Sequence, residues 1–196
     1  MGRPSGAPAP HPVSASRRIF SSMRIALPLV LAIANFAASA TSPPPMPELT
    51  HQDTADWINS RPLTWSALRG KVVLVDFWTF DCSNCRGSIA WLHSIEREFG
   101  GKDFVIVGVH TPELPQEYER DRVAAKIVEY GLTNPQMIDN DYSYWKAVGN
   151  EYWPAFYIVD QHGRARALFA GETHVGDPQA QHIEETIRAL LNSSGE

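Results

Sequence analysis

A run of apolar and β-branched residues, Lys71–Thr79, restricts most strongly what this chain can fold into. The run lacks the alternation of a half-exposed strand, so it predicts a strand buried on both faces of a sheet. Cys82-Ser83-Asn84-Cys85 follows directly, and a helical repeat of apolar residues then extends to Phe99. The chain's two cysteines therefore lie where a buried strand passes into a helix. The amino end of a helix lowers the pKa of a thiol placed there.

The rest of the chain beyond residue 57 alternates strands and helices with short connections. We expect further strands at 57–59 with 63–64, 104–109, 136–138, 155–160 and 164–170, and helices at 83–99, 117–130, 142–148 and 178–191. This order predicts an α/β protein whose central mixed sheet is covered by helices on both faces. No repeat or composition shift marks a second folded unit, so residues 57–196 are interpreted as one domain.

The residues before that domain have two different compositions. Residues 1–40 contain Arg17-Arg18, then an apolar run from Ile25 to Ala38, and small residues at Ala38-Ser39-Ala40. This order is typical of an N-terminal extension and a secretory signal cleaved after Ala40. An uncleaved membrane anchor is the alternative, but the apolar run has 14 residues where a spanning helix needs about 20. The proline-rich segment 41–56 reads as an extended linker.

The signal predicts a periplasmic or secreted protein. Export through the Sec or the Tat pathway stays open, because Arg17-Arg18 resembles a twin-arginine motif and translation could also begin at Met23. The compartment is oxidising in either case, which favours a disulfide or a redox role for an exposed cysteine pair. The formal net charge of −5 without a basic stripe argues against nucleic-acid binding. We expect a monomer.

The spacing of the cysteines points to thiol–disulfide exchange. Only a thiolate attacks a disulfide, and Cys82 at the helix start is the expected nucleophile. Cys85, three residues on, lies on the same helical face and can act as the resolving thiol. A purely structural disulfide is one alternative, although a loop this short contributes little stability. Half of a zinc site is the other, but His93 and His110 lack the required spacing.

These motifs resemble the thioredoxin superfamily. The pattern consists of Asp76-Phe77-Trp78, the two cysteines, and Trp153-Pro154 before an Ile-Val-Asp strand. Gly108–Glu113 and Tyr152–Ala155 further resemble the extracytoplasmic group that includes the TlpA/ResA-type disulfide reductases and the thioredoxin-like domain of DipZ-type proteins. The resemblance extends over about residues 63–191, and it implies a thioredoxin fold.

The resemblance also implies roles for five further residues. Pro154 should follow a cis peptide bond, and its loop with Trp153 should face the cysteines and bind the substrate backbone. Asp76 should be a buried carboxylate beneath the resolving thiol, with a raised pKa suited to proton transfer. Trp78 should pack near the cysteine pair, and Glu113 should lie near the active site. The alternatives are a hydrogen-bonded strand-end residue for Asp76, a core residue for Trp78 and an exposed loop residue for Glu113.

The function expected from these features is a thiol-disulfide oxidoreductase, and a reductase rather than an oxidase. It would act on protein disulfides, use no metal or organic cofactor beyond its redox-active Cys82–Cys85 disulfide, and receive electrons from a separate membrane donor. Asp81 departs from the family pattern, and its charge should oppose the Cys82 thiolate. A thiol peroxidase is one alternative, and a metal-handling or assembly factor is another; its expected C-x-x-x-C spacing is absent here.

Overall fold

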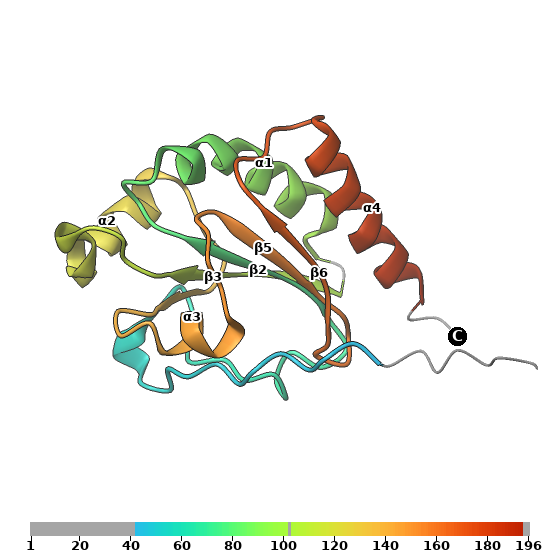
Figure 1. Cartoon of the computed structure of the whole chain (residues 1–196), viewed down its shortest axis with the longest axis horizontal. Coiled ribbons are helices and arrows are strands. Elements are labelled where there is room, and N and C mark those ends of the chain that lie inside the picture. The colour runs from blue at the N-terminus through green and yellow to red at the C-terminus, as the bar shows by residue number, and fades with distance from the viewer. Residues whose placement is uncertain (1–41, 102, 194–196) are drawn as a thin grey trace, which may run out of the picture. The chain divides into compact units, whose positions relative to one another are not determined.

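The computed structural model describes residues 42–101 and 103–193, and a six-stranded mixed sheet forms its centre (Figure 1). The strands are β1 (Trp57–Ile58), β2 (Val72–Trp78), β3 (Phe104–His110), β4 (Gln136–Ile138), β5 (Ala155–Val159) and β6 (Ala165–Ala170). Their order in the sheet is β1-β4-β3-β2-β5-β6. β2, β3 and β4 pair in parallel, whereas β5 runs antiparallel to both β2 and β6. The predicted α/β class and mixed sheet are confirmed.

Helices cover both faces of this sheet, as the alternating sequence predicts. They are α1 (Ser83–Phe99), α2 (Arg120–Glu129), α3 (Ser143–Val148) and α4 (Pro178–Asn192), with 3-10 turns η1 (Thr54–Asp56) and η2 (Pro115–Tyr118). In Figure 1, α1 and α4 lie on one side of the sheet and α3 lies on the other. None of the helices within the described ranges has the length and hydropathy that crossing a membrane requires.

The central strand β2 divides the core into two layers, because side chains alternate between the faces of a strand. Val72 and Leu74 join the layer beneath α1 and α4, and Val73, Val75 and Phe77 join the layer on the opposite face. Every residue of β2 is buried. This explains why the sequence of β2 is apolar throughout, and it places Asp76 on the α1 side by the same alternation.

Two predicted elements differ from the structure. Residues 63–64 form no strand, and β1 pairs instead with β4, which follows it by some eighty positions in sequence. The helix expected over 117–130 is divided into η2 and α2. The two elements are separated at Glu119, whose extended backbone (φ −77°, ψ 106°) is the N-cap of α2. The side chain of Glu117 is buried rather than on a solvent-facing helix surface.

The prediction of an extended linker at residues 41–56 is also wrong for the residues of this segment that the structure describes. Residues 43–56, here called the N-terminal arm, pack on the domain through the buried side chains of Met46 and Leu49. The Met46 amide donates to the Gly163 carbonyl (2.9 Å), and the Ala165 amide donates to the Pro44 carbonyl (3.0 Å). Through these hydrogen bonds to the β5–β6 hairpin, the proline-rich segment packs as part of the folded domain. The expected signal, residues 1–40, lies outside the described residues.

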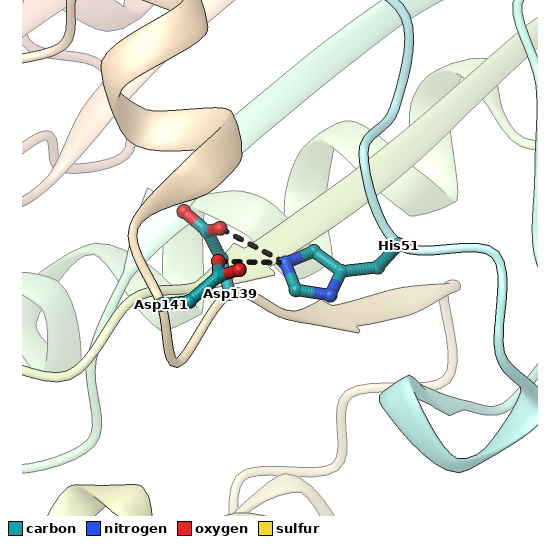
Figure 2. Close-up of side chains that lie close together, drawn as sticks. All are labelled: His51, Asp139 and Asp141. Carbon is teal, nitrogen blue, oxygen red and sulfur yellow. Dashed lines mark hydrogen bonds and ion pairs between the residues drawn. The ribbon is translucent and has the colours of Figure 1, made fainter.

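His51 fastens the N-terminal arm to the loop between β4 and α3 (Figure 2). Its Nε2 lies 3.1 Å from Asp139 Oδ1 and 3.3 Å from Asp141 Oδ1, and its Nδ1 lies 3.2 Å from Asp56 Oδ2. Asp139 is fully buried and also accepts the backbone N–H of Tyr144, at the start of α3. The hydrogen bond to Asp139 is the main reason why the pKa of His51 is raised to about 9.

We predict that this contact stabilises the domain in a pH-dependent way. The folded-state pKa of His51 is raised, so its contribution is complete below pH 6.5 and declines as pH rises through about 9. His51→Gln should lower the free energy of unfolding by about 1.5–3 kcal/mol at pH 6, as expected for hydrogen bonds to charged groups. Urea unfolding of both proteins across this pH range measures it. His162→Gln, in the exposed β5–β6 turn, is the matched control, and a difference independent of pH would contradict the prediction.

Candidate active site

Cys82 occupies the N-cap position of α1, immediately after the loop that leaves β2. Its backbone is extended (φ −67°, ψ 116°), and its Sγ accepts a hydrogen bond from the Cys85 amide (3.2 Å). An N-cap side chain normally satisfies one of the free amides at a helix start, and here the sulfur does so. Cys82 is half-buried and Cys85 is buried. One sulfur therefore reaches solvent and the other lies behind it.

The two thiols differ strongly in acidity. The Cys85 side chain, hydrogen-bonded to the Cys82 sulfur, lowers the pKa of Cys82 to about 7, and the backbone amides of Cys85 and Asn84 add to this effect. Burial acts in the opposite direction at Cys85, where it raises the pKa far above its ordinary value. At neutral pH the accessible sulfur is thus substantially a thiolate, while the buried one keeps its proton.

Asp76 provides a buried carboxyl group on the α1 side of β2. It is 4% exposed, and its Oδ1 has no hydrogen-bond partner among the described residues. Burial raises the pKa of Asp76 to about 8, with a further contribution from the charge of Cys82. The Asp76 charge in turn contributes to raising the pKa of Cys85. Asp76 and the two sulfurs are therefore electrostatically linked, whereas a hydrogen-bonded strand-end residue would show a satisfied Oδ1.

Trp78 is a core residue at the end of β2. It belongs to the same apolar cluster as Cys85, and its Nε1 donates to the buried Gln136 Oε1 (2.8 Å). The side chain of Gln136 lies directly over the backbone of Gly108. A Cβ at Gly108 would come within 2.0 Å of Gln136 Oε1, so a larger residue would displace it. Trp78 thus shares an apolar cluster with Cys85, and the hydrogen bond that it donates to Gln136 in β4 fixes its ring.

The Trp153-Pro154 peptide bond is cis, as the resemblance implied. The Trp153 ring is half-buried, packs with the cluster that contains both cysteines, and lies 4.1 Å from the Trp145 ring between centroids. Its Nε1 donates to the Thr111 carbonyl (3.0 Å). The neighbouring Tyr152 is 52% exposed. The loop before β5 therefore contributes an aromatic side chain to the apolar cluster on which both cysteines pack.

Burial of Cys82 and, to a smaller extent, the charge of Glu113 counter the lowering of the Cys82 pKa. Asp81 directly precedes Cys82, but its Oδ2 accepts a hydrogen bond from Gln116 Nε2 (2.6 Å). That the charge of Asp81 opposes the Cys82 thiolate stays a prediction.

Two buried polar residues near the site were missed as functional candidates in the sequence. His110 ends β3 fully buried, and burial lowers its pKa to about 4. Its Nε2 lies 3.3 Å from Thr79 Oγ1, and its ring stacks on Phe80. Glu117 is fully buried and accepts hydrogen bonds from three backbone amides. In sequence, a glutamate near the start of a charged helix gives no sign of such burial.

The described residues contain one group of histidine and carboxylate side chains with metal-ligand spacing, and it includes neither cysteine. The group is His51, Asp139 and Asp141, whose ligand atoms lie within 4.8 Å of one another. Asp139 already accepts amide hydrogen bonds from Tyr144 and Trp145. We therefore interpret the group as the clasp that fixes the N-terminal arm.

Comparisons with known proteins agree with the fold. The Redoxin family matches residues 35–185. DipZ of Mycobacterium bovis is 36% identical over 142 residues, which cover 70% of this chain and 20% of DipZ. Thiol-disulfide oxidoreductase YkuV of Bacillus subtilis is 28% identical over 127 residues, covering 65% of this chain and 84% of YkuV.

Among solved structures, a thioredoxin-like protein in the oxidised form is 26% identical, with a TM-score of 0.65, covering 77% of this chain and 97% of its own. The chain belongs to the Redoxin family and has a thioredoxin-like fold, and it spans about a fifth or less of the length of the first curated relatives that it matches.

We predict that alkylation of the reduced protein separates the two thiols. Iodoacetamide should modify Cys82 with a rate that follows a pKa of about 7, while Cys85 stays unmodified because it is buried and protonated. Mass spectrometry of digests taken between about pH 5 and pH 9 measures both rates. Cys82→Ser should abolish the fast modification. Faster modification of Cys85 than of Cys82, or a Cys82 pKa below about 5, would contradict the assignment.

Proposed function

We propose that this protein exchanges its Cys82/Cys85 dithiol–disulfide pair with disulfides of other proteins outside the cytoplasm, and that it acts as a reductase. One observation carries the proposal. The half-buried Cys82, with a pKa of about 7, is paired with a buried Cys85 whose pKa is strongly raised. Such an asymmetric pair supplies an attacking thiolate and a protected second thiol.

The first step is attack by the Cys82 thiolate on one sulfur of a substrate disulfide. A Cys82–substrate disulfide forms, the substrate S–S bond breaks, and the second substrate sulfur leaves as a thiolate. In the second step Cys85 loses its proton and attacks the Cys82 sulfur. The Cys82–Cys85 disulfide forms, and the other substrate sulfur leaves. Two electrons pass from the protein's pair to the substrate, which becomes a dithiol after protonation.

Asp76 is the proposed proton acceptor for the second step. A thiol with a raised pKa needs a base close by, and a base whose own pKa lies near the working pH serves best. Burial supplies such a base by raising the pKa of Asp76 to about 8. The unpartnered Oδ1 of Asp76 is free to accept a proton, because no described residue donates a hydrogen bond to it.

Trp153 and Pro154 form the proposed substrate-binding loop, with Trp78 as support beneath the cysteine pair. The Trp153 side chain is held by Thr111 and Trp145, so the loop before β5 has a fixed orientation. The exposed ring of Tyr152 extends this surface for an unfolded or extended protein segment.

The extracytoplasmic location rests on the N-terminal sequence, and the direction of electron flow rests on thiol acidity. A Cys82 pKa of about 7 is close to that of thioredoxin and far above the value near 3.5 of a strong oxidant. A less stabilised thiolate corresponds to a more reducing pair. The pair requires no metal or organic cofactor in this mechanism, and a membrane-bound dithiol donor would return it to the reduced form.

Trapping tests this function. Cys85→Ser, expressed in the native compartment, should accumulate mixed disulfides between Cys82 and its protein substrates, because the resolving thiol is missing. Non-reducing gels and mass spectrometry identify them. Cys82→Ser and the double variant are the controls. If Cys85→Ser traps no more protein than Cys82→Ser does, the exchange function is contradicted.

A second prediction concerns Asp76. Asp76→Asn should slow resolution of a Cys82 mixed disulfide on the order of 10²-fold, the size of a general-base contribution. In the wild type the rate should rise with pH to a midpoint at or below about 8, since the mixed disulfide removes the Cys82 charge that helps to raise the Asp76 pKa. Stopped-flow release of a chromophoric thiol from Cys82 measures both.

The matched control for Asp76→Asn is Asp103→Asn. Asp103 lies next to the opposite end of β2, and its side chain is 75% exposed. This variant should resolve the mixed disulfide at the wild-type rate with the wild-type pH profile. If Asp76→Asn also resolves the mixed disulfide at the wild-type rate and with the wild-type pH profile, Asp76 is not the proton acceptor.

A further inference from the structure

Glu117 is a buried carboxylate that joins the two loops flanking the nucleophile. It lies in η2 and is 0% exposed. Its Oε1 accepts the amide of Asp81 (2.9 Å), the residue directly before Cys82. Its Oε2 accepts the amides of Glu113 (2.7 Å) and Leu114 (2.6 Å), in the loop after β3. One side chain therefore bridges the loop that carries the nucleophile and the loop that carries its opposing charge.

The neighbouring residue strengthens this bridge. Gln116, also in η2, donates from Nε2 to the Asp81 carboxylate (2.6 Å), so η2 holds both the backbone and the side chain of Asp81. On the other side, Arg86 donates to the carbonyls of Phe80 (3.3 Å) and Asp81 (2.9 Å). The loop before Cys82 is thus fixed through its amide by Glu117 and through its carbonyls by α1.

The hydrogen bonds of Glu117 are all made to backbone amides. Within residues 42–101 and 103–193, no ion pair to the Glu117 carboxylate is present. A buried carboxylate without a cationic partner is costly unless donors satisfy it, and charge-assisted hydrogen bonds are stronger than neutral ones. Glu117 therefore holds the two loops together more firmly than an amide side chain could, since an amide has only one acceptor oxygen.

We propose that Glu117 is a positioning residue for thiol exchange, which fixes the Glu113 carboxylate relative to the Cys82 sulfur by tying both loops to one buried side chain. A role in thiol exchange rests on the proposed function. The physical claim can be tested without it: the effect of the Glu113 charge on the Cys82 thiolate requires the carboxylate of Glu117.

A double-mutant cycle tests this coupling. The four reduced proteins are the wild type, Glu113→Gln, Glu117→Gln and the double variant, and the readout is the thiolate absorbance of Cys82 near 240 nm as a function of pH. Glu113→Gln should raise the thiolate fraction at pH 6 about twofold in the wild-type background, the size of a screened repulsion across a solvated gap. In the Glu117→Gln background the same change should have no effect, because the released loop no longer holds Glu113 in place. Equal effects in both backgrounds would overturn the proposal.

Gln116→Ala is the control within η2. It removes the contact to the Asp81 side chain but leaves all three amide hydrogen bonds to Glu117, so Glu113→Gln should still raise the thiolate fraction about twofold in this background. Loss of the effect in Gln116→Ala would show that η2 as a whole, rather than Glu117, fixes the loops, and would also overturn the proposal.

Hydrogen exchange in the wild type keeps the proposal testable if Glu117→Gln does not fold. The side chains of Asp81, Glu113 and Leu114 are exposed, yet their amides should exchange slowly because all three donate to Glu117. Exchange as fast as in unprotected loops would overturn the proposal. Failure of the exchange function would appear separately, as wild-type thiolate coupling without trapped partners in the Cys85→Ser experiment.

Discussion

The junction between the end of β2 and the start of α1 is the constraint on which the rest of the site depends. β2 is buried along its whole length, so its path through the sheet is fixed by packing on both faces. The helix that follows begins with a sulfur in the N-cap position. This arrangement makes one cysteine accessible and acidic while the other lies buried against the sheet. The junction alone thus makes the two cysteines differ in exposure and acidity, before any other site residue contributes.

Much of the fold could be predicted because its signals are local. The uniform burial of β2 follows from its unbroken apolar sequence, and α1 and α4 follow from the spacing of apolar residues such as Ile95 and Ile183. The cis peptide at Pro154 and the burial of Asp76 were predicted through family resemblance rather than through physical derivation. These features belong to the common framework of the fold, so a short motif is enough to locate them.

The features that could not be predicted depend on contacts between distant segments. The N-terminal arm has few apolar residues, and its packing depends on the β5–β6 turn and on Asp139, both far along the chain. Glu117 has the sequence surroundings of a surface helix, and its burial is caused by amides on two other loops.

Asp76 has a consequence for the stability of the domain as a whole. The folded protein holds a proton on this residue up to a pH of about 8, whereas an unfolded chain would release it near pH 4. Stability therefore falls as pH rises between those values, because the unfolded state gains by ionising and the folded state does not. An apolar residue at this position would remove that loss, as well as the cost of burying an unpaired oxygen, about 1–3 kcal/mol. The domain is thus less stable at neutral pH than its packing would permit, a cost that the proposed role of Asp76 in proton transfer would explain.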